Sequence, residues 1–236
     1  MDCTLVILLY GEYPDIARRC LASLVPTVKQ FGLDVRLCTN MLGPQSRAFV
    51  GQVTQSGFAR LHYDSNQNRR KYPLMRRAFF DPEQPITTPW VMWFDDDSYL
   101  REPEDIGWYT RVVAAFANAD MLGRVYQLAL QGQQHRAIQA QPWYGGKPVD
   151  IGARVSFATG GWWCLRTEII RRYDWPIPSL DHCGGDVLLG ELCRQQNLRL
   201  VNFDDGVAIN ADATGRHSSA PRRGFDSQPW GYDYSG

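Results

Sequence analysis

The fold of this chain is decided by residues 89–100, which read PWVMWFDDDSYL. The first half of the stretch is bulky, apolar and rich in residues that favour strands, so both of its faces are hydrophobic. That pattern predicts a strand buried at the centre of a parallel sheet. The strand ends in three adjacent carboxylates, Asp95, Asp96 and Asp97. Ligands of open α/β sheets bind outside the carboxyl ends of the strands, so we expect a ligand site here.

Three adjacent carboxylates resist ionising together, because like charges this close raise one another's pKa. A bound divalent cation would remove that cost. Alternate side chains of an extended chain share a face, so Asp95 and Asp97 would point at one ion. Asp96 would point away from the ion, toward a ribose hydroxyl or toward a hydrogen-bond donor that supports the metal ligands. The alternative is a solvated acidic turn, or a helix N-terminus with acidic residues in its first turn.

The composition bounds the size and class of the protein. The chain has 236 residues, 44% of them hydrophobic, which suits one sizeable core and is too little for two large domains. Twenty-five basic and twenty-five acidic residues cancel, which argues against a protein that mainly binds nucleic acid non-specifically. No signal peptide opens the sequence, and no apolar run reaches the roughly 20 residues of a membrane helix. We expect a soluble, cytoplasmic protein.

The cysteines carry no sign of a metal centre. Six of them are scattered without Cys-x-x-Cys spacing, so a zinc site is not expected. Without a secretory signal they are expected to be reduced and mostly buried. They are Cys3, Cys20, Cys38, Cys164, Cys183 and Cys193.

Hydrophobic periodicity predicts strands and helices that suit a mostly parallel sheet. One apolar stripe predicts a helix over 15–31 that stops at Gly32, a common C-cap residue. The segment between the second and third strands carries no predicted helix, and residues 131–153 are predicted to form a long loop. The predicted strands cover 4–10, 34–39, 58–63, 90–94, 121–130 and 198–202. Further helices are predicted over 72–80, 103–120 and 167–173, and from about Asp186 onward.

Three motifs in this order resemble those of the inverting GT-A glycosyltransferases. The chain is similar broadly to the family 2 enzymes, and in its motifs to the fringe-like β-1,3-glycosyltransferases. Residues 93–99, WFDDDSY, resemble the Asp-Asp-Asp-x-Tyr form of the metal-binding DxD motif. Residues 157–161, FATGG, resemble a segment that walls the active site there. Residues 185–190, GDVLLG, resemble the start of the helix that carries the catalytic base.

The resemblance implies a domain organisation. It covers the first strand to about residue 218, and implies one α/β, Rossmann-like GT-A domain over 1–218 with helices flanking a mostly parallel sheet. Residues 219–236 would form a flexible C-terminal tail. Relatives have an acid where this chain has Gly185, so one carboxylate for acceptor binding is missing. Fringe-like enzymes carry an N-terminal membrane anchor and this chain starts at its first strand, so we expect a compact microbial or viral relative.

The resemblance also assigns chemical roles. Asp186 is the candidate general base that deprotonates the acceptor hydroxyl; the alternative is an aspartate that only caps its helix. Asp97, with Asp95 contributing directly or through water, would hold a divalent cation. His217 resembles a C-terminal histidine that completes the metal site, and an imidazole ligand favours Mn²⁺ over Mg²⁺. The alternative for His217 is a solvent-exposed histidine of the tail.

The donor is expected to be a nucleoside diphosphate sugar, with a UDP-sugar favoured. The residues that bind this donor are expected in three places: after the first strand, in the cationic segment before the acidic strand, and at the glycine pair. The two glycines permit a tight turn or a close approach to a ligand. The expected donor-binding residues are Tyr10, Glu12, Tyr13, Lys71, Arg76, Asp96, Gly160 and Gly161. Candidates for stacking on an acceptor are Trp143, Trp162 and Trp163, with core packing as the alternative for each.

The function expected from these features is metal-dependent, inverting transfer of a sugar to a hydroxyl on a glycan or lipid carrier. A modified DNA base is the less favoured acceptor. The arginines at 69–77 and 222–223 could bind DNA phosphates, so this acceptor stays an alternative. A steep salt dependence of acceptor binding would identify it. A nucleotidyltransferase is the second reading, although no glycine-rich phosphate loop with a lysine follows the first strand. A catalytically inactive sugar-binding domain is the third, against which the presence of Asp95, Asp97 and Asp186 together argues.

Overall fold

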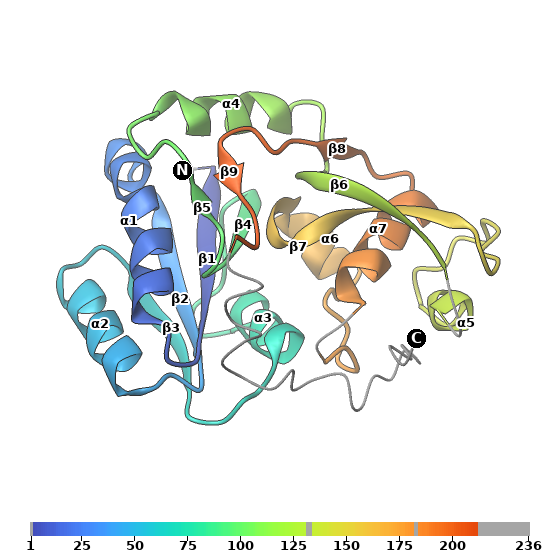
Figure 1. Ribbon diagram of the computed structural model, residues 1–236. Coiled ribbons are helices and arrows are strands. Elements are labelled where there is room, and N and C mark those ends of the chain that lie inside the picture. The colour runs from blue at the N-terminus through green and yellow to red at the C-terminus, as the bar shows by residue number, and fades with distance from the viewer. Residues whose placement is uncertain (1, 131–133, 182–183, 212–236) are drawn as a thin grey trace.

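A computed structural model describes residues 2–130, 134–181 and 184–211 (Figure 1). Its main strands are β1 (Cys3–Tyr10), β2 (Asp34–Asn40), β3 (Arg60–Ser65), β4 (Trp90–Asp95), β6 (Met121–Ala129), β7 (Arg154–Arg166) and β8 (Leu200–Asn202). They form a seven-stranded sheet in the order β3-β2-β1-β4-β7-β6-β8. All neighbouring pairs are parallel except those that β7 makes with β4 and β6. The prediction of a mostly parallel sheet is confirmed.

Helices flank both faces of this sheet. They are α1 (Pro14–Phe31), α2 (Pro44–Gln55), α3 (Lys71–Phe79), α4 (Gly107–Phe116), α5 (Gln134–Gln139), α6 (Thr167–Arg172) and α7 (Gly185–Gln195). Buried side chains of α1, α2 and α4 form one core cluster, and those of α3, α5, α6 and α7 form a second on the other side (Figure 1). A separate antiparallel pair joins β5 (Tyr99–Leu100) to β9 (Val207–Ala208).

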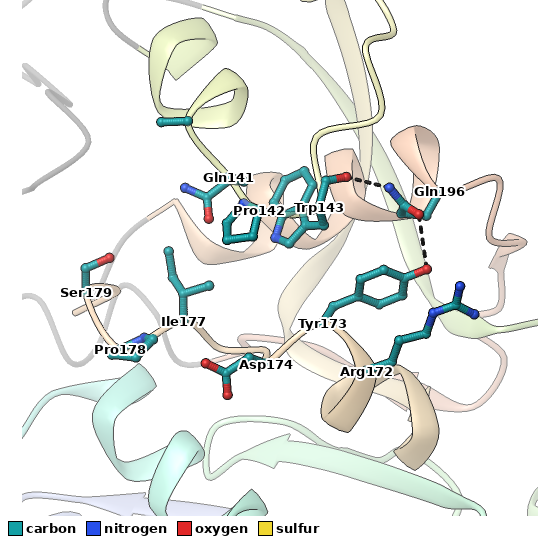
Figure 2. A pocket seen from close by; sticks show the side chains of 11 residues that line it. Gln141, Pro142, Trp143, Arg172, Tyr173, Asp174, Ile177, Pro178, Ser179 and Gln196 are labelled. Atoms are coloured by element: carbon teal, nitrogen blue, oxygen red, sulfur yellow. Dashed lines mark hydrogen bonds between the residues drawn. The ribbon is translucent and has the colours of Figure 1, made fainter.

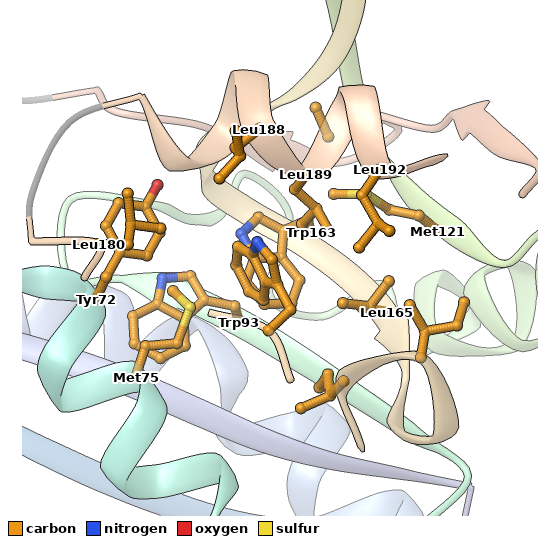
Figure 3. Close-up of a cluster of buried hydrophobic side chains, with 14 of the residues drawn as sticks. Tyr72, Met75, Trp93, Met121, Trp163, Leu165, Leu180, Leu188, Leu189 and Leu192 are labelled. Atoms are coloured by element: carbon orange, nitrogen blue, oxygen red, sulfur yellow. The ribbon is translucent and has the colours of Figure 1, made fainter. Parts of the chain in front are cut away.

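Strand β4 is the buried central strand that its sequence predicts. Each of its side chains from Trp90 to Phe94 is at most 4% exposed. They alternate between the two core clusters, so that Trp93 faces α3 and α7 while Phe94 faces α1 and α4. Figure 3 shows the indoles of Trp93 and Trp163 together beneath α7, and their ring centroids lie 6.0 Å apart. Burying each large apolar side chain contributes about 1.5–3 kcal/mol, so the strand is anchored from both sides.

Helix α1 ends where predicted. Gly32 has φ 60° and ψ 41°, and its N–H donates to the carbonyl oxygen of Val28. This left-handed conformation is cheap for glycine and costly for other residues, so the sequence stops the helix at that position.

Helix α2 is missing from the sequence prediction. Its described buried residues are Ser46 and Val50, too few to produce an apolar stripe. Strands β2 and β3 are parallel, and a parallel pair needs a crossover connection, which α2 supplies. The need for this helix therefore comes from the sheet rather than from the segment itself.

Three other boundaries differ from expectation. Helix α4 starts at Gly107 instead of 103, because residues 102–106 form turns in which Asp105 N–H donates to the carbonyl of Glu102. The expected loop over 131–153 contains α5 among its described residues. Strand β7 runs straight through Gly160 and Gly161, so no tight turn forms at the glycine pair.

The described cysteines, Cys3, Cys20, Cys38, Cys164 and Cys193, are buried free thiols, as expected. Among the described helices, none combines the length and the apolar surface that crossing a bilayer requires.

Candidate active site

The order of the sheet strands reverses between β1 and β4. From β1 the chain builds outward through β2 and β3, and then returns to place β4 on the other side of β1. Ligands of open α/β sheets bind at such a point, outside the carboxyl ends of the strands. The acidic triplet follows β4 at this point. The sequence prediction of where a ligand site lies therefore agrees with the sheet topology.

Asp96 ties the two central strands together. Its Oδ2 accepts the backbone N–H of Tyr10 at 3.0 Å, and its own N–H donates to the carbonyl of Leu8 at 3.1 Å. The residue is 2% exposed. The carboxylate expected to reach a ribose hydroxyl is thus turned toward the end of β1, where it positions Tyr10.

The three aspartates do not continue as a strand. Strand β4 ends at Asp95, and the N–H of Ser98 donates to the Asp95 carbonyl at 2.9 Å, which closes a turn. The expectation that Asp95 and Asp97 share one face of an extended chain is therefore wrong. Asp97 is 5% exposed, and its carbonyl accepts the N–H of Ala211 at 2.9 Å.

Asp95 forms an ion pair with Lys71. Its Oδ2 accepts from Lys71 Nζ at 2.6 Å, while its Oδ1 accepts from Trp93 Nε1 at 2.8 Å. Lys71 Nζ also donates to the carbonyl of Gly160 at 2.5 Å. The side chains of Lys71 and Asp95 are 12% and 20% exposed, so salt screens this pair less than a surface pair. One ammonium group therefore joins α3, β4 and β7.

Asp186 lies in the first turn of α7, where its Oδ1 accepts the N–H of Val187 at 3.0 Å. Burial raises the pKa of this carboxyl above its ordinary value, and the negative charge of Asp95 acts in the same direction. The hydrogen bond from Val187 and the positive charge of Lys71 oppose that rise. Asp186 thus lies within electrostatic reach of the Lys71–Asp95 pair.

Packing explains why residue 185 is a glycine. A Cβ placed there would lie 2.1 Å from Cζ and 2.5 Å from the hydroxyl oxygen of Tyr72. Tyr72 follows Lys71 on α3 and is 4% exposed. The tyrosine therefore occupies the space that a side chain at 185 would need, and an acid cannot be accommodated without moving it.

The glycine pair allows other groups to approach β7 closely. A Cβ on Gly160 would lie 3.1 Å from Lys71 Nζ, and one on Gly161 would lie 2.1 Å from Asn210 Oδ1. Asn210 donates its N–H to Ser98 Oγ at 3.1 Å and its Nδ2 to Thr159 Oγ1 at 3.3 Å. The glycine pair therefore lets the protein's own side chains approach β7 closely, while the expected close approach to a ligand stays a prediction. Asn210, Ser98 and Thr159 could not be found from sequence, because single polar residues in separate segments carry no local signal.

The candidate nucleoside side lies at the ends of β1 and β2. Glu12 caps α2: its Oε1 accepts the N–H of Gln45 at 2.8 Å and its Oε2 that of Ser46 at 3.3 Å. Tyr10 and Tyr13 are half-buried nearby. Asn40, also missed from sequence, accepts the N–H of Arg69 at 2.9 Å and so holds the segment before α3 against β2. Glu12 therefore supports this region through α2.

Arg76 is not brought to the acidic turn. Its guanidinium binds the carbonyls of Asp174 and Pro176 at 3.2 and 2.7 Å and the Asp174 carboxylate at 2.8 Å. Five residues of helix rotate a side chain by about 140°, so Lys71 and Arg76 face different directions. The donor-binding role expected of Arg76 is at odds with this placement, because the side chain is engaged by the loop after α6.

The tryptophans divide into two groups. Trp162 and Trp163 are 0% and 2% exposed, and they pack against Phe94 and Trp93 on β4. Core packing, the alternative to acceptor stacking, describes both in this conformation, because neither ring face is open to a ligand. Trp143 is 4% exposed and lines a cavity away from the acidic turn (Figure 2).

His217 and the expected tail over 219–236 lie outside the described residues.

The described residues fit a cation that is completed by ligand oxygens. Within residues 2–130, 134–181 and 184–211, no three His, Cys, Asp or Glu side chains gather as a metal-binding group. Both Asp95 oxygens are engaged by Lys71 and Trp93, and Asp96 is engaged by Tyr10. Asp97 adds a third carboxylate at the same turn. Mg²⁺ is often held by one or two carboxylates together with substrate phosphates, and this arrangement is of that type.

Comparisons with known proteins identify the fold. No protein-family model matches the chain, and no curated protein matches it in sequence. Solved GT-A glycosyltransferase structures do match. The S. aureus TarS 1–349 complex with UDP-GlcNAc matches 87% of this chain and 56% of its own, with 11% identity and TM-score 0.53. GalNAc-T7 with UDP, GalNAc and Mn²⁺ matches 85% of this chain and 41% of its own, with 11% identity and TM-score 0.60.

The Pyrobaculum calidifontis mannosyltransferase PcManGT, in complex with GDP-Man and Mn²⁺, matches 86% of this chain and 55% of its own, with 12% identity and TM-score 0.56. The chain therefore spans about half of the length of these structures. At this identity the likeness establishes the fold. The protein is a single α/β domain with the Rossmann-like GT-A fold that the sequence motifs predict.

Proposed function

We propose that this protein is a metal-dependent, inverting glycosyltransferase. It moves a sugar from a nucleoside diphosphate sugar, with UDP-sugars the favoured donors, to an acceptor hydroxyl. The observation that carries the proposal is the Asp95–Lys71–Asp186 arrangement beside the acidic turn, at the reversal point of the sheet. Structures that share the fold hold UDP-GlcNAc, UDP or GDP-Man, which supports a nucleotide-sugar donor.

The leaving diphosphate must be stabilised as its charge develops. A divalent cation, when bound, supplies that stabilisation as a Lewis acid. Asp97 would hold the cation on the protein side, and His217 is the candidate ligand from the C-terminal segment. Lys71 lies beside Asp97's turn, where its ammonium can bind a phosphate oxygen. Asp95 and the Gly160 carbonyl hold that ammonium in position before the donor arrives.

Asp186 serves as the general base. As the acceptor oxygen forms its bond to the sugar C1, the bond from C1 to the diphosphate oxygen breaks, and the hydroxyl proton passes to the Asp186 carboxylate. Direct displacement with inversion needs one base and no enzyme nucleophile. Burial raises the pKa of Asp186 and so makes its ionised form a stronger base than an ordinary aspartate.

The proposed acceptor class is the one that the resemblance to GT-A glycosyltransferases implies. A sugar hydroxyl on a glycan or lipid carrier is the proposed acceptor class, and a modified DNA base ranks behind it because the chain carries no net charge. Cytoplasmic location, in a microbe or in a cell infected by a virus, belongs to the same proposal.

The test is a thermal-unfolding panel of nucleotide sugars, each with Mn²⁺ and with EDTA, followed by product analysis. A donor at about a hundred times its Kd adds about 2.7 kcal/mol, which raises Tm by roughly 5–10 °C in a domain of this size. We expect one donor to raise Tm only with metal, and Asp97→Asn to abolish the shift. Glu83→Gln, at an exposed carboxylate, is the matched control. In a parallel assay with a nucleoside triphosphate and a sugar 1-phosphate, release of pyrophosphate would identify a nucleotidyltransferase. Donor binding without turnover would identify a sugar-binding domain.

A further inference from the structure

A second candidate site lies at the far end of α7. A cavity of about 580 Å³ opens between the segment after α5, the segment after α6 and the C-terminal end of α7 (Figure 2). This volume falls within the range of small-molecule sites. Gln196, which ends α7, lines it. Ten residues of helix separate Gln196 from Asp186, so the cavity lies about 15 Å along α7 from the proposed base.

Two polar atoms of the cavity wall are buried without a hydrogen bond. Trp143 is 4% exposed, and its Nε1 has no partner among the described residues. Figure 2 shows the nitrogen-bearing edge of this indole turned toward the side of the cavity where Ile177 lies. Gln141 donates its Nε2 to the Ala137 carbonyl at 2.9 Å, and its Oε1 is buried with no partner in the described part of the chain. Buried polar atoms are normally paired, so one donor and one acceptor are left without a described partner. Neither atom is open to solvent, so a small movement of the side chains must bring them to a ligand.

The wall around these atoms is held rigidly. Gln196 donates its Nε2 to the Trp143 carbonyl, and its Oε1 accepts from the Tyr173 hydroxyl at 3.2 Å (Figure 2). Arg76 fixes the opposite segment through the Pro176 carbonyl and the Asp174 carboxylate. A wall fixed before binding lowers the entropy cost of taking up a ligand.

The chemistry of the lining favours a neutral, hydroxyl-rich ligand. Hydroxyl groups both accept and donate, so they match a donor such as Trp143 Nε1–H and an acceptor such as Gln141 Oε1. The cavity wall carries one cation, Arg172, and one anion, Asp174, which pairs with Arg76 at 2.8 Å. The lining thus has no excess charge to attract a phosphate or a nucleotide. The ring of Tyr173 and the apolar side chains of Pro142 and Ile177 suit the C–H faces of a sugar.

We propose that this cavity binds a saccharide unit of the acceptor, away from the unit whose hydroxyl reacts. The inference rests on the proposed function, because it takes the acceptor to be a glycan. It narrows the acceptor class to oligosaccharides long enough to reach from the N-terminal to the C-terminal end of α7.

The experiment uses the whole protein labelled with ¹⁵N in its eight tryptophans, each of which has one indole N–H signal in NMR. The probes are the methyl glycosides of glucose, galactose, mannose and N-acetylglucosamine. We expect at least one glycoside to shift the Trp143 signal, assigned with Trp143→Phe, in a saturable way. In Trp143→Phe the same glycoside should bind about five- to tenfold more weakly, the loss expected for one neutral hydrogen bond.

Trp175→Phe is the matched control. Trp175 is 1% exposed and its Nε1 also has no partner among the described residues, but it does not line the cavity. Glycoside affinity should be unchanged in this variant. If none of the four glycosides shifts the Trp143 signal, or if Trp143→Phe and Trp175→Phe weaken binding equally, the proposal is overturned; ordered water is then the occupant.

UDP with Mn²⁺, added to the same sample, reports separately on the donor site. A glycoside response without any response to UDP would leave the saccharide cavity standing and count against the glycosyltransferase. A response to UDP without a response to any glycoside would overturn the saccharide cavity and leave the proposed glycosyltransferase standing. With active enzyme, Trp143→Phe should raise KM more for an oligosaccharide acceptor than for a monosaccharide acceptor, and Trp175→Phe should raise neither.

Discussion

The two ends of helix α7 treat polar groups in opposite ways. At the N-terminal end, charged side chains are paired before any ligand arrives: Asp95 with Lys71, and Asp186 with the N–H of Val187. At the C-terminal end, the neutral groups of Trp143 and Gln141 are buried without described partners. A buried charge without a partner costs far more than a buried neutral group without one. The fold therefore pairs the charges of Asp95, Lys71 and Asp186 and leaves the neutral groups of Trp143 and Gln141 for a ligand to satisfy.

The largest effect should come from Asp186→Asn. Loss of a general base lowers kcat by about 10²–10⁴-fold, while donor binding, measured by thermal shift, should be retained. Stability at neutral pH should not fall, because the amide oxygen can still accept the Val187 N–H and no charge needs to be buried. Lower stability with normal activity per folded molecule would show instead that Asp186 only caps α7.

Lys71→Met should destabilise the protein by about 2 kcal/mol, because it leaves the Asp95 carboxylate without its cation in a largely buried site. Urea unfolding measures the loss. The double variant Lys71→Met/Asp95→Asn should recover part of it, since the unpaired charge is then removed. Equal losses in the single and double variants would mean that the pair contributes nothing to stability.

Gly185→Ala should cost about 1–3 kcal/mol, because the new Cβ would lie 2.1 Å from Tyr72 Cζ. Gly51→Ala is the control: its Cβ meets nothing within 4 Å in α2, and Ala stabilises a helix by about 1 kcal/mol relative to Gly. The two unfolding free energies should therefore change in opposite directions.

The pH dependence should reveal the coupling at the N-terminal end. Asp186 must be ionised to act as a base, so activity should fall on the acid side at a higher pH than for an ordinary carboxyl group. Lys71→Met should move this acid-side fall in activity to higher pH and Asp95→Asn should move it to lower pH. The reason is that the charge of Lys71 lowers the pKa of Asp186 and the charge of Asp95 raises it.

The free energy of unfolding should decline as pH rises from about 4 to the raised pKa of Asp186, because Asp186 loses its proton at a lower pH in the unfolded chain than in the folded one. Asp186→Asn should lack this decline.

The smallest effect should come from Trp143→Phe on stability, a loss of about 1 kcal/mol from the smaller buried ring alone, because the deleted N–H makes no hydrogen bond to any described residue. Trp175→Phe measures the same packing loss in urea unfolding, so a much larger loss in Trp143→Phe would show that its N–H is paired inside the protein, and would remove the contrast between the two ends of α7.

Much of the fold could be predicted because its signals are local. The alternating burial of Trp93 and Phe94 follows from an unbroken apolar run, and the end of α1 follows from a single glycine. Helix α2 could not be predicted, because few of its residues are buried and the parallel β2–β3 pair creates the need for it. The acidic turn was placed correctly in the chain, but its geometry was not, since a hydrogen bond from Ser98 to the Asp95 carbonyl ends the strand.

Sequence alone determined which chemistry this protein carries: an acidic turn after a central strand, a glycine pair and an aspartate that opens a helix. These features are properties of short segments, so order and residue type are enough to read them. Tertiary structure decided which groups meet. It placed Lys71 on Asp95, turned Arg76 toward Asp174, and buried Trp162 and Trp163 in the core. Contacts between distant segments depend on the packing of the whole sheet, and no local pattern records them.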